Sequence, residues 1–185
     1  MIKRRFGKSL VFLLAVLIIF SFSMESVVGA TSNSGINENS SVQDMLEEMQ
    51  KYIYQDEDGK LIFNVDKAIE EEQSDFIIDS GKEFNALSNH VENKKESQSV
   101  SQILRGMPVW GNWCGPGHGG GVPKDKLDSL CMTHDLCYKV KGYFNCGCDK
   151  ALVAGITAAL PFMKSDEKRA ALAVAAYFSI APCKK

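Results

Sequence analysis

All six cysteines of the chain fall after position 113, at Cys114, Cys131, Cys137, Cys146, Cys148 and Cys183. An even number of closely spaced cysteines in an exported chain is typical of a small domain stabilised by disulfides. Three disulfides are therefore expected, but six cysteines allow about 15 pairings and their spacing does not choose among them. The alternative is a zinc site built from His134 and the four cysteines between positions 131 and 148.

The first 30 residues predict export. Basic residues at positions 3, 4, 5 and 8 precede the apolar run LVFLLAVLIIF, at positions 10–20. This run is short for a transmembrane helix and typical of a signal-peptide core. The small residues Val28-Gly29-Ala30 predict cleavage before Thr31, so residues 1–30 are interpreted as a signal peptide and the protein as secreted. An uncleaved membrane anchor is the alternative. Export into an oxidising compartment favours disulfides over zinc.

Charge divides the rest of the chain. Residues 31–105 hold 16 acidic and 7 basic side chains, a net charge of −9, whereas residues 106–185 hold 6 acidic and 10 basic ones, a net charge of +4. The cysteines all belong to the basic part. We therefore predict an acidic pro-segment or accessory region at 31–99 and a separate cysteine-rich domain at 100–185.

The acidic region carries helix and strand patterns but no catalytic pattern. The polar stretch 31–41 is expected to be disordered. Strand-like runs on both sides of Asp58-Gly59 predict a β-hairpin. Apolar residues then recur at helical spacing from Ile69 to Val91, with Gly81 as a weak point. The region is thus expected to be a small α/β or partly disordered segment.

The cysteine-rich part is predicted to be mostly α. Its apolar patterns indicate helices at residues 100–107, 124–140, 146–160 and 165–178. Pro123 suits the start of the second helix, and Ser165 is the expected N-cap of the fourth. The short turn KGYFN, at 141–145, joins the second and third helices.

The glycine-rich loop after Cys114 is typical of a calcium-binding loop. Glycines allow backbone carbonyl oxygens to converge without side chains in the way, and calcium prefers oxygen ligands. Asp135, on the helix that follows, is the carboxylate best placed to complete such a site. Asp125 and Asp128 are interpreted instead as a helix-start charge and a structural hydrogen bonder.

His134 is the candidate general base. It points about 100° away from Asp135 around the helix, so it is not expected to be a ligand on the same side. A histidine base needs an orienting partner on its other ring nitrogen, and Asp149, at the start of the next helix, is the candidate. Histidine, carboxylate and metal at adjoining positions indicate a water-activating hydrolytic centre.

The stretch WCGPGHGGGVPKDKLDSLCMTHDLCY (113–138), followed by CGCDKAL (146–152), closely resembles the secreted phospholipase A2 family. The family's calcium-loop pattern, C-G-x-G followed by more glycines, and its C-x-x-H-D-x-C-Y signature are both present and in order. The resemblance covers about residues 110–149. The loop is one residue longer than in the pancreatic type and the KGYFN turn leaves no room for that type's β-hairpin, so the shorter bacterial, fungal or invertebrate forms are more similar.

The resemblance implies specific catalytic roles. His134 would activate the attacking water, Asp149 would orient His134, and Tyr138 would donate a hydrogen bond to Asp149. The family disulfides would be Cys114–Cys131 and Cys137–Cys148, which leaves Cys146–Cys183. The implied fold is a disulfide-linked antiparallel helix pair beside a calcium-binding loop.

The resemblance also implies a calcium site. Asp135 and the backbone carbonyls of Trp113, Gly115 and Gly117 would hold Ca²⁺. The ion and the Gly115 N–H would stabilise the oxyanion formed at the sn-2 ester of a phospholipid.

The function expected from these features is a secreted calcium-dependent phospholipase A2 acting on phospholipid membranes or micelles. No pattern predicts binding of nucleic acid. The competing class is a membrane-disrupting toxin or antimicrobial protein that uses the fold without hydrolysis, but such a protein would not need His134, Asp135 and Asp149 together. Trp110 and Trp113 are interpreted either as core residues or as residues that insert into a membrane interface.

The opposite charges of the two parts predict a regulatory contact. The acidic region 31–99 is expected to mask a basic, membrane-seeking surface until proteolysis near Lys94-Lys95 or Arg105. A plain accessory domain or spacer is the alternative.

Overall fold

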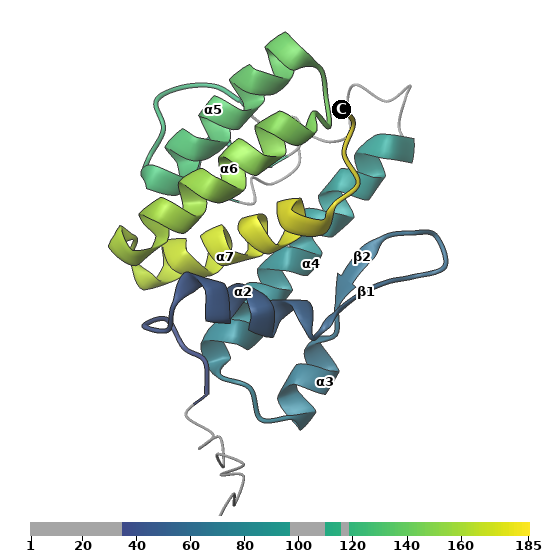
Figure 1. Ribbon diagram of the computed structural model, residues 1–185, viewed down its shortest axis with the longest axis vertical. Coiled ribbons are helices and arrows are strands. Elements are labelled where there is room, and N and C mark those ends of the chain that lie inside the picture. The colour runs from purple at the N-terminus through teal and green to yellow at the C-terminus, as the bar shows by residue number, and fades with distance from the viewer. Residues whose placement is uncertain (1–34, 97–109, 116–118) are drawn as a thin grey trace, which may run out of the picture. The chain divides into compact units, whose positions relative to one another are not determined.

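The computed structural model describes residues 35–96, 110–115 and 119–185. The predicted signal peptide and the predicted helix at 100–107 lie outside these residues. From Gly35 onward the chain forms one compact unit (Figure 1). Most of its residues are helical and its only sheet among the described residues has two strands, so the mostly α fold class is confirmed. None of the described helices is both long and apolar enough to span a membrane.

The acidic region begins with a helix that the sequence analysis did not predict, α2 (Val42–Gln50). The hydroxyl of Ser41 caps it by accepting a hydrogen bond from the Asp44 N–H at 3.1 Å. Just before it, the Asn37 N–H donates to the Ser40 hydroxyl at 3.0 Å. The expected disorder of 31–41 is therefore wrong for residues 37–41, because their polar side chains satisfy the backbone of a turn and a helix start.

The predicted hairpin is present. Strands β1 (Ile53–Gln55) and β2 (Leu61–Phe63) pair antiparallel, with Ile53 opposite Phe63. Gly59 in the connecting turn has φ +81°, a value that glycine adopts without strain. The side-chain amide of Asn85 then pairs with both the N–H and the carbonyl of Phe63, at 2.8 and 2.9 Å. This pairing fixes β2 against the following helix.

Residues 65–96 form two helices, α3 (Val65–Glu70) and α4 (Asp75–Glu96). Gly81 does not weaken α4; a Cβ there would lie 2.2 Å from the Phe63 ring, so glycine permits close packing against β2. Ile69 is not part of a buried stripe, because it lies in the last turn of the short α3 and is 54% exposed. The prediction of one continuous helical pattern from Ile69 to Val91 was therefore wrong, because this stretch forms parts of two helices with different orientations.

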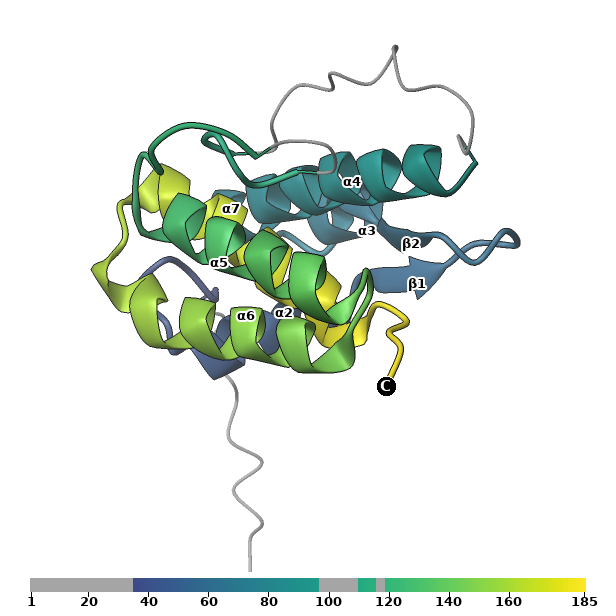
Figure 2. The same ribbon diagram turned by 90° about the horizontal axis from the view of Figure 1, so that it is seen from above.

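The cysteine-rich part contributes α5 (Lys126–Lys141), α6 (Cys146–Ala159), the short 3₁₀ helix η1 (Leu160–Phe162) and α7 (Ser165–Ile180). Helices α5 and α6 lie side by side, and α6 packs on α7 (Figures 1 and 2). Asp125 is the N-cap of α5, so the helix begins later than predicted from Pro123. Ser165 is the first residue of α7 rather than its cap; Lys164 takes the cap position without a side-chain hydrogen bond.

Helix α7 joins the acidic and basic parts in one hydrophobic core. It packs on α6 and also along α4 (Figure 2). Phe84 of α4 is fully buried, and its ring centroid lies 5.7 Å from that of Tyr177 on α7. The alanines of α7 between positions 170 and 176 are all buried, which allows close approach of the neighbouring helices. The change in net charge near Arg105 therefore does not coincide with a break in the core.

Candidate active site

The six cysteines form three disulfides, Cys114–Cys131, Cys137–Cys148 and Cys146–Cys183. These are the pairs that the resemblance implied, and no sulfur is left to bind zinc. The first ties the start of the glycine loop to α5, the second joins α5 to α6, and the third attaches the end of the chain to the start of α6. Disulfides closing loops of these lengths are worth about 3 kcal/mol each, which is much of a small domain's stability.

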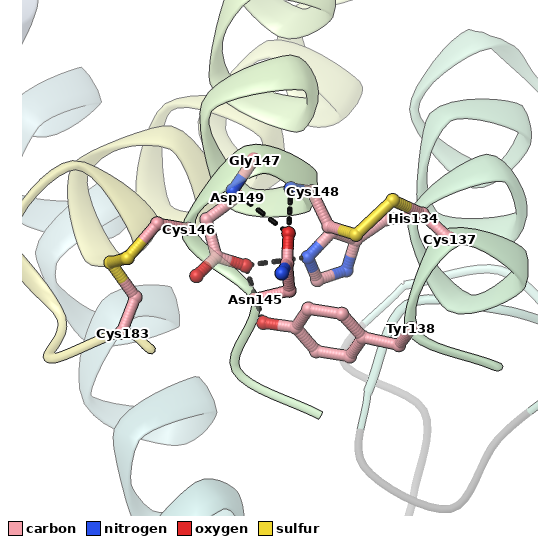
Figure 3. A network of polar contacts seen from close by, with 9 residues as sticks. All are labelled: His134, Cys137, Tyr138, Asn145, Cys146, Gly147, Cys148, Asp149 and Cys183. Carbon is pink, nitrogen blue, oxygen red and sulfur yellow. Dashed lines mark hydrogen bonds and ion pairs between the residues drawn. A yellow bond between two sulfur atoms is a disulfide. The ribbon is translucent and has the colours of Figure 1, made fainter. Parts of the chain in front are cut away.

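His134, Tyr138 and Asp149 form one buried polar network (Figure 3). Nε2 of His134 lies 2.8 Å from Oδ1 of Asp149. The hydroxyl of Tyr138 donates a hydrogen bond to the same oxygen. Each residue is less than a tenth exposed. The three residues that were predicted to act together are therefore in direct contact.

Local structure brings this network together. His134 and Tyr138 are one turn apart on α5, so their side chains project from the same face. Asp149 lies in the first turn of α6, where Asn145 caps the helix by accepting from the Gly147 N–H at 3.0 Å. The Cys137–Cys148 disulfide fixes the register of the two helices at this level (Figure 3).

The electrostatics of the network favour a neutral imidazole. Burial lowers the pKa of His134 below its ordinary value, and the hydrogen bond and charge of Asp149 oppose part of this shift. Burial, followed by the hydrogen bond to Asp149, raises the pKa of Tyr138, so its hydroxyl stays protonated. Because a carboxylate only accepts hydrogen bonds, Nε2 of His134 carries the proton and Nδ1 carries the lone pair.

Two aromatic residues of α7 pack near His134, one in contact with it and the other in contact with the first, and sequence reasoning missed both. The Phe178 ring meets the imidazole edge-on, with centroids 4.8 Å apart. Tyr177 packs on Phe178 at 5.3 Å and is itself 4% exposed. The sequence predicted a helix through Phe178 but held no signal for this contact, because the contact depends on how α7 packs against α5.

The predicted calcium ligands are only partly within the described residues. Gly117 lies outside them. The carboxylate of Asp135 lies beside the glycine loop, since a Cβ at Gly119 would be 3.6 Å from its Oδ2. The same Cβ would be 3.2 Å from the Trp113 ring, so Trp113 borders the loop as well.

The residues present suit a hard cation held mainly by backbone oxygens. No three acidic, histidine or cysteine side chains gather as a metal site in the described part of the chain. A cation beside Asp135 would therefore depend on loop carbonyls for its other ligands, and calcium is the biological cation that accepts such a set. Gly115, with φ +137°, gives the loop a backbone conformation that side-chain-bearing residues avoid.

Asp125 is a charge at the helix start and Asp128 is a structural hydrogen bonder, as predicted. Asp125 accepts from the Trp110 indole N–H at 2.7 Å, and Asp128 accepts from backbone N–H groups of the loop. The indole N–H of Trp113 donates to the Gly121 carbonyl at 3.1 Å. Both tryptophans are partly buried and pack against the core, which agrees with the first of their two interpretations.

Comparison with known proteins finds short local similarity to secreted phospholipases A2. The chain is 54% identical over 33 residues to the acidic phospholipase A2 S17-58 of Austrelaps superbus, which is 18% of this chain and 21% of that protein. The same identity, length and coverage hold for the acidic phospholipase A2 homolog taipoxin gamma chain of Oxyuranus scutellatus scutellatus. The human group IID secretory phospholipase A2 is 43% identical over 47 residues, 23% of this chain and 32% of the human protein.

These matches cover about a fifth to a third of the length of the curated relatives. No family model matches the chain. No solved structure matches it either. The similarity to phospholipase A2 is therefore strong but local.

Proposed function

We propose that this protein is a secreted calcium-dependent phospholipase A2 that hydrolyses the sn-2 ester of glycerophospholipids to a fatty acid and a lysophospholipid. The observation that carries the proposal is the buried contact between Nε2 of His134 and Oδ1 of Asp149, which lie 2.8 Å apart. His134 lies on α5, the helix that also bears Asp135. The local similarity to secreted phospholipases A2 supports the same reaction class.

The base is His134. Its Nδ1 accepts a proton from a water molecule, and the resulting nucleophile attacks the sn-2 carbonyl carbon. The proton on Nε2 stays in its hydrogen bond to Asp149, which holds the ring orientation and stabilises the imidazolium that forms. Tyr138 donates a second hydrogen bond to the same Asp149 oxygen and so helps to fix the carboxylate. When the tetrahedral intermediate collapses, the imidazolium returns its proton to the leaving lysophospholipid oxygen.

Asp135 and the backbone carbonyls of Trp113, Gly115 and Gly117 would hold Ca²⁺. Bound there, the ion supplies positive charge to the phosphate and to the oxyanion that develops on the ester carbonyl. The Gly115 N–H is the second oxyanion donor. Neutral backbone ligands leave most of the ion's charge uncompensated, which suits it to this role.

A phospholipid membrane or micelle surface is the proposed partner. The competing role, membrane disruption without hydrolysis, keeps some support because one matched relative is named a phospholipase A2 homolog. A module that only binds membranes has no need for a neutral histidine held by a buried carboxylate. We therefore favour hydrolysis.

The test is the release of fatty acid from phospholipid vesicles by the full mature chain. We expect release with calcium, none with chelator, and a loss of about 10²–10⁴-fold in His134→Gln, which removes the base. His90→Gln on α4 is the matched control and should keep full activity. Calcium-independent release, or an active His134→Gln variant, would contradict the mechanism.

A separate proposal concerns the acidic region 31–99. We propose that its net negative charge reduces the binding of the basic domain to anionic membranes, as the sequence suggested. The test compares vesicle binding and hydrolysis before and after limited proteolysis of the full mature chain. Inhibition predicts that cleavage raises both; a spacer or scaffold predicts no increase.

A further inference from the structure

One buried carboxylate, that of Asp128, lies under the beginning of the glycine loop. Asp128 is 0% exposed and belongs to the first turn of α5. Its oxygens accept hydrogen bonds from the Asn112 N–H at 3.0 Å, from the Trp113 N–H at 2.7 Å and from the Lys124 N–H at 2.8 Å. None of the described lysine or arginine side chains forms an ion pair with it. Among the described residues, its charge is thus satisfied by main-chain donors alone.

The turn before the loop is shaped to receive this carboxylate. Trp110 and Cys114 pair through two backbone hydrogen bonds, which close a tight turn. Within the turn, Gly111 has φ +58°, and the successive N–H groups of Asn112 and Trp113 point to one anion. Such a concave run of N–H groups is an anion-binding nest. A Cβ on Gly111 would lie 2.3 Å from the Asp128 carboxyl carbon, so glycine is required there for contact as well as for conformation.

The same carboxylate holds both ends of the loop. Asn112 and Trp113 precede the glycines, and Lys124 follows them. Asp128 also stands on α5, the helix that carries His134 and Asp135. A single side chain therefore fixes the position of the loop backbone relative to the helix that bears the proposed base and the proposed carboxylate ligand.

We propose that Asp128 is a positioning residue that sets the calcium affinity of the loop without touching the ion or the substrate. The inference rests on the proposed function, because it assigns Asp128 a task at that same site. Fixing Trp113 and Lys124 holds the loop carbonyls near their bound positions, so less ordering is needed when the ion binds. Partners that orient metal ligands in this way change metal affinity by about 10–100-fold when removed.

Asp128→Asn is the primary test, made in the full mature chain. The amide keeps the shape of the side chain, but its NH₂ group cannot accept the hydrogen bonds that one carboxylate oxygen now accepts. Calcium dissociation constants are measured by calorimetry, and by terbium luminescence sensitised by Trp113, which borders the loop. We expect affinity to fall about 10–100-fold. Activity at saturating calcium should change by less than about threefold, so the calcium requirement shifts while kcat does not.

Asp125→Asn is the matched control. Asp125 also lies at the start of α5, but among the described residues its carboxylate accepts only from the Asp128 N–H, at 2.9 Å, and from the Trp110 indole N–H. Asparagine is an equally good N-cap, so the helix should persist. Calcium affinity should stay within about threefold of wild type.

A second variant keeps the Asp128 carboxylate and disturbs only the turn that binds it. Gly111→Ala places a methyl group against Asp128, and we expect it to weaken calcium binding while the hydrogen exchange of the Asn112 and Trp113 amides speeds up. This readout needs no activity and also applies if Asp128→Asn folds poorly. Wild-type calcium affinity in both variants would overturn the positioning role.

The outcomes separate this inference from the proposed function. If the wild-type protein binds calcium but releases no fatty acid, the proposed function fails and the affinity series still tests Asp128. If the wild type hydrolyses phospholipid and Asp128→Asn binds calcium equally well, only the positioning role fails. If the wild type binds no calcium, both are overturned.

Discussion

Oδ1 of Asp149 lies 2.8 Å from Nε2 of His134, although the two residues are 15 positions apart on different helices. The disulfide between Cys137 and Cys148 joins the two helices next to this contact. Cys137 is one turn from His134, and Cys148 immediately precedes Asp149. The crosslink and the polar contact therefore depend on the same register between α5 and α6, and each stabilises the other.

Asp149→Asn should reduce the rate of hydrolysis by about 10²–10⁴-fold. The amide favours the wrong imidazole tautomer, because its NH₂ group donates to the nitrogen that should carry the proton. Initial rates of fatty-acid release from vesicles with calcium measure the effect. Asp166→Asn, in the first turn of α7, is the control and should retain wild-type rates. Comparable activity in the two variants would show that Asp149 does not orient the base.

Tyr138→Phe should cost stability more than activity. The variant removes one hydrogen bond to a buried carboxylate, which is worth about 1.5–3 kcal/mol, and leaves the His134–Asp149 contact in place. We expect the urea midpoint to fall and the rate of hydrolysis to drop by less than about tenfold. Tyr143→Phe, at a residue that is 61% exposed, should leave the midpoint nearly unchanged. A loss in Tyr138→Phe as large as that in Asp149→Asn would mean that the phenol acts in the chemistry itself.

In calcium-free buffer, the pKa of His134 should lie below its ordinary value of 6.5, because burial disfavours the imidazolium. NMR titration of the imidazole protons measures it directly. In Asp149→Asn the pKa should fall further, since the carboxylate is what opposes the effect of burial.

The lowered pKa of His134 also makes the stability of the protein depend on pH. Between pH 6.5 and the folded-state pKa, the unfolded chain binds more protons at this site than the folded chain. The free energy of unfolding is therefore fully retained above pH 6.5 and falls as the pH drops toward the folded-state value. Urea titrations of wild type and His134→Gln at several pH values isolate this contribution. A His134 pKa above 6.5 would reverse the sign and contradict the burial argument.

Phe84→Ala should destabilise the cysteine-rich part as well as the acidic region, by about 3–5 kcal/mol. Phe84 is fully buried against Tyr177 of α7, so the cavity would open in a core that both parts share. Urea unfolding can be followed by tryptophan fluorescence, because Trp110 and Trp113 both report on the cysteine-rich part.

Ile69→Ala, at a residue that is 54% exposed, is the control and should change stability by less than about 0.5 kcal/mol. An unchanged fluorescence transition in Phe84→Ala, with loss of helix signal only, would indicate two independent folding units. That result would favour a removable acidic region.

Much of the local structure was predictable from the sequence. The hairpin around Asp58-Gly59, the turn at 141–145 and the helices that bear His134 and Asp149 follow from turn residues and apolar spacing. The expected contact between His134 and Asp149 also exists, because it needs only a helix pair in one register. Helix ends were less predictable, since they depend on which side chain caps them: Asp125 for α5, and none for α7.

Contacts between distant segments were not predictable. Nothing in the period of apolar residues showed that Gly81 exists to admit the Phe63 ring, or that Phe178 would meet the imidazole of His134. The spacing of apolar residues gives the face that a helix buries but not the partner it is buried against. The missed helix α2 is amphipathic, but the polar stretch before it obscured its start.

The sequence by itself indicated the chemistry proposed for the centre, because the glycine loop, His134 and Asp135 are encoded close together and Asp149 follows on the next helix. Only the tertiary structure decided what supports that centre. Helix α7 packs on both α4 and α6, so the acidic region shares its core with the cysteine-rich part despite their opposite charges. The reason is physical: most charged side chains are exposed, whereas the core is formed by buried apolar contacts that net charge does not describe.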